Sequence, residues 1–230
     1  MQKNNIIHLV VGAIATNCWI YKLEPQPRSS KISEGSLLDE ETAAVIDPGD
    51  EAEIIISALK KNNLIPKYIL LTHGHFDHIA AVPELAAAFN PRPEIAIHRL
   101  DSEYLGPDAY KAHSLSIKAA MGSTSFIDAL WNNMPQPDRL LEEGDTIGPF
   151  TVLHIPGHTR GSIAFWDKNE KNLFTGDTLF KDDCGRTDLP GGNEKEMIES
   201  LRRLSAMDGN ITVYPGHGDT TSIGQESRAY

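Results

Sequence analysis

The chain has 230 residues, of which 40% are hydrophobic and 23% charged, so it can bury the core of one large soluble domain. Its formal net charge of −11 argues against a nucleic-acid partner, because such proteins usually present a basic face. No apolar stretch is long enough to cross a membrane, and two cysteines are too few for a disulfide framework. We therefore expect a cytoplasmic single domain over residues 1–230, monomeric or homodimeric, that acts on a small molecule.

The N-terminal part of the chain has the pattern of β-strands. Residues 6–23 have the pattern of two short strands joined at residues 12–17, and residues 42–46 have that of a third. Between them, residues 24–41 are rich in Pro, Ser, Gly and Glu, which predicts an exposed hairpin loop. The first apolar run has the outline of a secretion signal, but His8 interrupts it, so we expect a strand there.

A strand, turn, helix, strand order begins after the third strand. The Asp-Pro-Gly sequence at 47–49 predicts a turn, and residues 51–63 carry apolar side chains at helical spacing. Residues 67–72 then have strand character. An Ala- and Leu-rich run over 79–89 predicts a second helix.

The rest of the chain is less regular at first and clearer toward its end. Residues 100–137 carry spaced apolar side chains that predict a helical insertion broken near Gly122. We expect strands over 94–98, 150–155, 162–167, 172–175 and 211–214, and an amphipathic helix over 194–205. This order of elements predicts an α/β (α+β) fold in which two sheets pack together with helices outside.

Four potential metal ligands lie within six residues, where the strand at 67–72 is followed by the helix at 79–89. They are His73, His75, Asp77 and His78. Alternate side chains of an extended or loop backbone point the same way, whereas helical residues two apart face away from each other, so the spacing favours a loop. Imidazole and carboxylate together suit zinc, iron or manganese better than calcium or magnesium.

Three later strand-like runs also end at a glycine that precedes a possible ligand. These ligands are His158, Asp177 and His217. Each would be an ordinary turn residue if it stood alone, but loops at the ends of strands gather functional groups, and the seven candidates together suit two ions. We expect the remaining His8, His98, His113 and His154 to serve packing or lie at the surface. His154, Thr159 or Thr178 could instead contact the outer nitrogen of a ligand histidine.

These motifs resemble the metallo-β-lactamase superfamily, over residues 6–218. The sequences at 73–78, 156–159, 176–180 and 215–218 are similar to the pattern of its glyoxalase II group, the hydroxyacylglutathione hydrolases. The resemblance implies a four-layer αββα sandwich with metals at one edge. It also implies a first metal site of His73, His75 and His158, a second of Asp77, His78 and His217, and Asp177 between them.

The chain departs from the glyoxalase II pattern near its end. Those enzymes carry a further helical domain that helps to hold glutathione, whereas here only residues 219–230 follow the last motif. The segment 184–192 is similar instead to short, single-domain glyoxalase II-like hydrolases. Arg186 takes the place of a lysine that contacts glutathione in the longer enzymes, so it either binds an anionic end of the substrate or ties down its own loop through Asp188.

The reaction implied by the resemblance is hydrolysis of a thioester such as S-lactoylglutathione. Two transition-metal ions, zinc first with iron or manganese as alternatives, would activate a bridging hydroxide to attack the carbonyl carbon, and Asp77 would orient that nucleophile as a catalytic carboxylate. The alternatives are a persulfide (sulfur) dioxygenase with one iron, a hydrolase of lactones or other esters, and a metal-holding interaction module. A secreted β-lactamase is disfavoured, because Asp177 resembles the bridging carboxylate of the thioester hydrolases.

Overall fold

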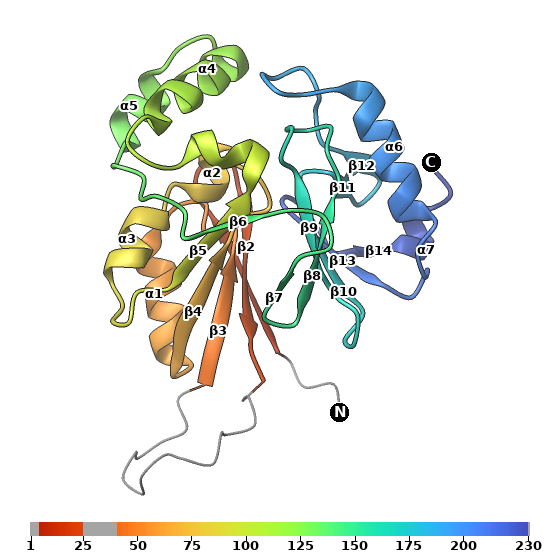
Figure 1. The fold of residues 1–230 in the computed structure, drawn as a ribbon, viewed down its shortest axis with the longest axis horizontal. Helices are drawn as coiled ribbons and strands as arrows, with labels where there is room; N and C mark the ends of the chain where they lie inside the picture. The colour runs from red at the N-terminus through yellow and green to blue at the C-terminus, as the bar shows by residue number, and fades with distance from the viewer. Residues whose placement is uncertain (1–4, 25–40, 230) are drawn as a thin grey trace, which may run out of the picture.

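The computed structural model describes residues 5–24 and 41–229, and it shows two β-sheets packed face to face between outer helices (Figure 1). This arrangement confirms the αββα sandwich expected from the sequence. The predicted hairpin loop at 24–41 lies almost entirely outside the described residues. In the described part of the chain, no helix has the length and apolar character needed to cross a membrane.

The first sheet is built from the N-terminal half of the chain. Its six strands lie in chain order: β1 (Ile6–Val11), β2 (Thr16–Lys22), β3 (Glu41–Ile46), β4 (Leu64–Leu70), β5 (Glu94–His98) and β6 (Arg139–Leu141). The strands β1 to β3 pair antiparallel, and β3 to β6 pair parallel. Helices α1 (Ala52–Lys61) and α3 (Val82–Ala87) cover the outer face of this sheet (Figure 1).

The second sheet is built from the C-terminal half. Its strands, in spatial order, are β14 (Thr221–Ser222), β13 (Thr212–Pro215), β10 (Asn172–Gly176), β9 (Ile163–Asp167), β8 (Phe150–His154) and β7 (Thr146–Ile147). Helices α6 (Glu194–Ser205) and α7 (Ile223–Glu226) flank it, and β11 (Leu179–Phe180) pairs with β12 (Asp183–Cys184) beside it.

Three apolar clusters hold the four layers together. Phe165 and Phe174 are fully buried between the two sheets. Ile55 of α1 packs in the cluster outside the first sheet, and Leu201 of α6 packs in the cluster outside the second. Burial of each such side chain stabilises the fold by roughly 1.5–3 kcal/mol, so the helices are fixed to their sheets and the strand ends are held in place.

The parallel strands bring the predicted ligand segments to one edge of the sandwich. β3, β4 and β5 are parallel, so the segments that follow β3 and β4 start at the same edge of the first sheet. In the second sheet β8 and β10 each pair antiparallel with β9, and β10 is parallel to β13, so these three also end on one side. The backbone N–H of Asn17 donates to the carbonyl of Gly216 at 2.7 Å and joins the two sheets there.

The prediction of a loop over the whole histidine cluster is wrong for its second half. Helix α2 (Phe76–Ile79) begins inside the cluster, so Asp77 and His78 lie on a helical turn. The predicted single helix at 79–89 is correspondingly replaced by α2 and the separate α3. The buried ring of Phe76 packs in the outer core, which favours an early start of the helix.

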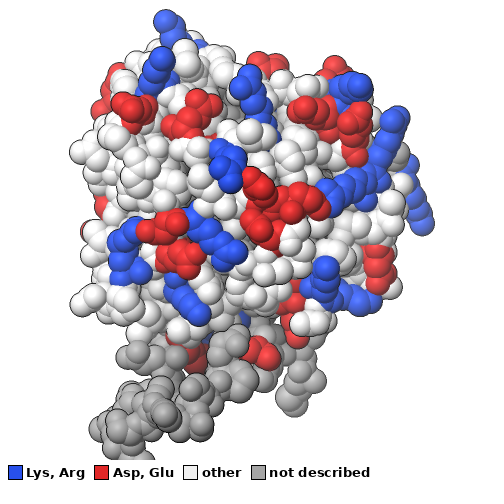
Figure 2. Space-filling view, viewed as in Figure 1, with Lys and Arg blue, Asp and Glu red and all other residues white. Residues whose placement is uncertain are grey.

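Helices occupy most of residues 99–130, as expected for the start of the segment 100–137, whereas residues 131–137 form no helix. These helices are the 3-10 helix η1 (Arg99–Tyr104), α4 (Ala109–Met121) and α5 (Ser125–Leu130). The break falls at Gly122, whose φ of 78° ends α4 in the left-handed conformation that glycine adopts most easily. On the face shown in Figure 2, basic and acidic side chains are interspersed, and they form no continuous basic stripe.

Candidate metal centre

The first group of candidate ligands joins the two sheets. His73 and His75 lie in the loop after β4, and His158 lies in the loop after β8. One ligand atom from each lies within 4.8 Å of the other two, and Nδ1 of His75 is 2.8 Å from Nε2 of His158. All three residues are buried. The two loops thus bring three imidazoles, supplied by both sheets, together in one small space.

The second group lies beside the first. Asp77 and His78 are presented by α2, and His217 follows β13. These three residues also offer ligand atoms within 4.8 Å of one another, and the Nε2 atoms of His78 and His217 are 3.2 Å apart. Successive helical residues point about 100° apart, which allows neighbours such as Asp77 and His78 to border one space.

Asp177 lies between the two groups. Its Oδ1 is 3.3 Å from Nε2 of His78, while its Oδ2 is 3.6 Å from Nε2 of His158 and 3.5 Å from Nε2 of His217. The same carboxylate therefore contacts both groups. Gly216 permits this approach, because a Cβ at that position would lie 2.1 Å from Oδ1 of Asp177.

The side chains at this centre fit a pair of cations. Within the described residues, Nε2 of His73 and Nε2 of His75 are buried and have no hydrogen-bond partner. Leaving buried polar atoms unsatisfied costs free energy, and such atoms are rare in native proteins. A donor set of imidazole nitrogens and carboxylate oxygens is the kind that transition metals bind.

The protonation states of four of these side chains suit cation binding. Burial lowers the pKa of His73 well below its ordinary value and that of His75 to about 3, so both rings keep a free lone pair at neutral pH. Burial alone would raise the pKa of the two carboxyls, but neighbouring histidines, His78 first, hold that of Asp77 at about 2 and that of Asp177 well below its usual range. Metal ligands must be deprotonated, as these four groups are. Burial alone would lower the pKa of His78, but Asp177 and Asp77 raise it well above its ordinary value, so a cation bound at this ring would displace its proton.

Asp47 contacts the candidate centre, and the sequence interpretation missed this because it treated the residue only as part of a turn. It directly follows β3, which pairs parallel with β4, and its Oδ2 lies 3.1 Å from Nδ1 of His78. It also accepts hydrogen bonds from the backbone N–H and the hydroxyl of Thr72. The available signal was its place at the end of a buried strand beside the strand that leads to His73.

Asp101 is a second residue that was missed, in the part of the chain with the least legible pattern. Its buried carboxylate accepts hydrogen bonds from the backbone N–H of Gly74, the backbone N–H of Gly161 and the hydroxyl of Thr159. It therefore ties the loop that carries His73 and His75 to the loop that carries His158. No motif around it in the sequence signals this role.

The outer nitrogens of two candidate ligands face backbone carbonyls. Nδ1 of His158 lies 2.7 Å from the carbonyl oxygen of Arg186, and Nδ1 of His217 lies 3.3 Å from that of Ala15. Such contacts fix the orientation of a ligand ring. The groups considered for this role from the sequence lie elsewhere: Thr159 bonds to Asp101, Thr178 bonds to the carbonyl of Ile155, and His154 bonds to that of Arg160.

The guanidinium of Arg186 is engaged by its own loop. Its Nε and Nη2 donate to the two carboxylate oxygens of Asp188 at 2.7 and 2.8 Å. This is the second of the two roles predicted for Arg186, and its contact with substrate stays a prediction. The other histidines have structural partners: His8 stacks on Trp19, and the buried His113 contacts the carbonyl of Tyr104.

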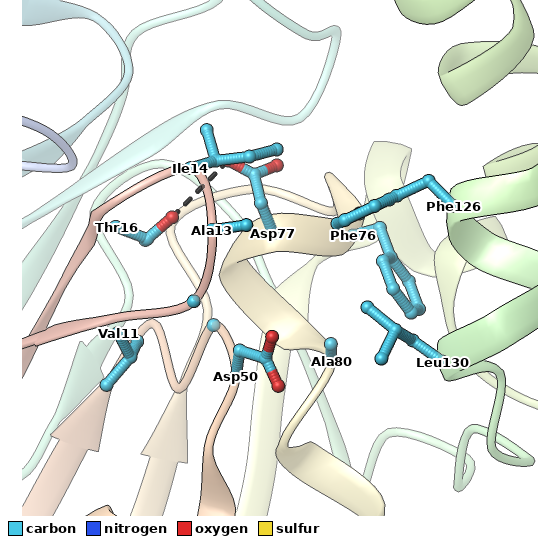
Figure 3. Close-up of a pocket in the computed structure, with 12 residues that line it drawn as sticks. Val11, Ala13, Ile14, Thr16, Asp50, Phe76, Asp77, Ala80, Phe126 and Leu130 are labelled. Atoms are coloured by element: carbon cyan, nitrogen blue, oxygen red, sulfur yellow. Dashed lines mark hydrogen bonds between the residues drawn. The ribbon is translucent and has the colours of Figure 1, made fainter.

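A pocket lies beside Asp77, between the loop that joins β1 to β2 and helix α5 (Figure 3). Ile14 of that loop and Phe126 and Leu130 of α5 line it, so its walls are largely apolar. The hydroxyl of Thr16 donates to Oδ2 of Asp77 at 3.4 Å, along the dashed line in Figure 3. The pocket has a volume of only about 10 Å³, about the space of one water molecule, so it borders the second ligand group without room for a larger group.

Comparisons with known proteins agree with this geometry. The family model described as the metallo-beta-lactamase superfamily matches residues 36–217. Hydroxyacylglutathione hydrolase GloC of Haemophilus influenzae is 38% identical over 197 residues, which cover 83% of this chain and 87% of that protein.

Two solved structures are also similar over nearly their full length. The di-iron-bound form of TTHA1623 has a TM-score of 0.76 at 34% identity, and the match covers 96% of this chain and 97% of that chain. The BLEG-1 B3 metallo-beta-lactamase has a TM-score of 0.74 at 31% identity, and the match covers 97% of this chain and 96% of that chain.

Proposed function

The chain belongs to the metallo-β-lactamase superfamily, and we propose that it is a dinuclear metal-dependent hydrolase of small thioesters such as S-lactoylglutathione. The observation that carries the proposal is the position of Asp177, whose carboxylate contacts His78, His158 and His217 from both ligand groups. A shared carboxylate is what a pair of ions held close together requires, because it neutralises part of their mutual repulsion.

The proposed ligands are the two groups at the sheet edge. His73, His75 and His158 would hold one ion, Asp77, His78 and His217 the other, and Asp177 both. When bound, such a pair supplies Lewis acidity toward the carbonyl oxygen and a water activated as a nucleophile near neutral pH. We propose zinc as the first candidate for these ions, with iron or manganese as the alternatives. The name of the di-iron-bound relative TTHA1623 supports keeping iron among them.

Asp77 is the proposed catalytic carboxylate. Its Oδ2 lies 3.4 Å from Nε2 of His217 and accepts a hydrogen bond from Thr16, so the carboxylate is fixed at the rim of the centre. Its pKa of about 2 keeps it ionised, so it can accept a hydrogen bond from the attacking water and aim a lone pair at the carbonyl carbon.

The proposed substrate is a thioester for two reasons. The name of the relative GloC gives a hydroxyacylglutathione hydrolase, and a thiolate is a good leaving group that needs little further protonation. We also propose that the protein is cytoplasmic and binds neither nucleic acid nor membrane. The mixed charges in Figure 2, the formal net charge of −11 and a cysteine count of two, too few for a disulfide framework, support this.

The experiment is a comparison of substrates on one preparation of the purified protein. Thiol release from S-lactoylglutathione is measured beside hydrolysis of a lactone and of a β-lactam, and beside oxygen uptake with glutathione persulfide. We expect thiol release to have the highest kcat/KM and oxygen uptake to stay at background. Oxygen uptake with no thiol release would replace the proposal with the one-iron dioxygenase, and preference for the lactone or the β-lactam would replace the thioester.

A further inference from the structure

Arg160 lies two residues after the candidate ligand His158 and lines two grooves at the loop that carries this ligand. The larger, of about 350 Å³, runs along residues at the start of α6, including Asn193 and Glu196. The smaller, of about 120 Å³, lies toward η1 and α4 and includes Glu103. Arg160 is the one charged residue that lines both grooves.

The guanidinium of Arg160 has no partner among the described residues. Two other arginines in this half of the fold are occupied: Arg186 forms an ion pair with Asp188, and Arg203 forms one with Glu143. Across residues 5–24 and 41–229, Arg160 makes no side-chain hydrogen bond or ion pair. A cation at the mouth of a groove, with its donors unused, is suited to an incoming anion.

The backbone that carries Arg160 is held firmly. The residues on both sides of it, Thr159 and Gly161, are bonded to the buried carboxylate of Asp101. Its own carbonyl oxygen lies 2.8 Å from Nε2 of His154. A guanidinium on so fixed a backbone loses little conformational freedom on binding, which favours recognition.

The surroundings of Arg160 favour a carboxylate over a polyphosphate. The larger groove reaches the N-terminus of the twelve-residue helix α6, whose dipole attracts negative charge. Glu196 lines the same groove and Glu103 the other, so several phosphates would meet repulsion. One cation with a carboxylate nearby suits a zwitterion, whose own carboxylate faces Arg160 and whose ammonium faces Glu196.

We propose that Arg160 and Glu196 form a subsite for an amino-acid end of the thiol that leaves during thioester hydrolysis. The subsite rests on the proposed function for its place in the reaction. The proposal assigns to Arg160 the recognition of the anionic end of the substrate, which was one of the two roles expected from the sequence for Arg186. The expected consequence is selectivity for thiols that end in a zwitterion over thiols that are uncharged.

The test measures binding of S-methylglutathione by titration calorimetry, because this thioether cannot be hydrolysed. We expect Arg160→Gln to raise Kd roughly tenfold, which corresponds to about 1.4 kcal/mol, because the variant loses a charge-assisted contact. Arg202→Gln, which removes an equal charge from an exposed part of α6, should leave Kd unchanged. Glu196→Gln should weaken binding of S-methylglutathione but not of its N-acetylated form, which has no ammonium.

Kinetics provide the second readout. Arg160→Gln should raise KM for S-lactoylglutathione about tenfold with kcat little changed, and should not alter KM for an uncharged N-acetylcysteamine thioester. Equal Kd values for the wild type and Arg160→Gln, or no binding of S-methylglutathione to the wild type, would overturn the subsite. If binding depends on Arg160 but no thioester is hydrolysed, the subsite holds and the proposed reaction fails.

Discussion

Oδ2 of Asp47 lies 3.1 Å from Nδ1 of His78, at the point where the end of β3 meets α2. The same carboxylate bonds to the backbone N–H and hydroxyl of Thr72, the residue before His73. One buried side chain therefore orients a ring of the second ligand group and the backbone of the first.

Replacing Asp47 tests this relationship. Asp47→Asn keeps the size of the side chain but removes its charge, so we expect metal affinity to fall about 10- to 100-fold, as for other outer contacts of ligand histidines. Competition with a fluorescent chelator measures the affinity. Asp208→Asn, at an exposed ion pair with Lys171, is the matched control and should bind metal like the wild type. Unchanged affinity in Asp47→Asn would show that the contact does not support the centre.

Replacing Asp177 tests the bridge. Asp177→Ala should abolish most hydrolysis and lose at least one metal ion, because the carboxylate contacts both ligand groups. Metal content and thiol release are measured on the same preparation. The control is Asp108→Ala, since Asp108 is exposed and makes no side-chain capping bond to α4. A fully active Asp177→Ala with its metals intact would mean that the ligand set is wrongly assigned.

Gly216 offers a test that leaves every ligand in place. A Cβ in Gly216→Ala would lie 2.1 Å from Oδ1 of Asp177 and 2.7 Å from Cε1 of His78, so these ligands must move. We expect metal retention and kcat to fall although the protein stays folded. Gly144→Ala introduces the same methyl into open space at a φ of 82°, which costs about 1 kcal/mol of stability but should not affect metal. If both variants retain metal equally, the close approach of Gly216 is not required.

The sequence predicted the elements that have strong local signals. The strands around residues 42–46, 94–98 and 162–167 have alternating or continuous apolar patterns, and the amphipathic helix at 194–205 matches α6 at both ends. The seven candidate ligands could be chosen because each follows a strand-like run, and the structure brings all seven together at one edge.

Contacts between distant segments could not be predicted in the same way. Asp101 gathers Gly74, Thr159 and Gly161, and nothing local to Asp101 signals partners so far along the chain. The helical turn at Asp77 was missed because the spacing argument treated the backbone as uniform, whereas burial of Phe76 favours the helix. The availability of Arg160 depends on which carboxylates fold near it, which a sequence pattern does not give.

The buried His113 predicts a pH dependence of stability. Burial lowers its pKa from 6.5 to about 4, so the unfolded chain takes up a proton first as the pH falls. The free energy of unfolding is therefore unaffected by protonation of His113 well above pH 6.5 and falls as the pH drops toward 4. About 1.4 kcal/mol is lost by pH 5.5. His113→Gln keeps a donor for the carbonyl of Tyr104 without this titration. Urea unfolding at pH 7.5 and 5.5 should show a smaller loss in the variant, and equal losses would contradict the assignment.

The metal content of the purified protein tests the central claim most directly. Elemental analysis should find close to two transition-metal ions per chain, since two ligand groups share Asp177. Removal of the ions with a chelator should abolish thioester hydrolysis, and re-addition of zinc should restore it. A single iron per chain, with no second metal and with oxygen consumed on addition of glutathione persulfide, would contradict the dinuclear hydrolase.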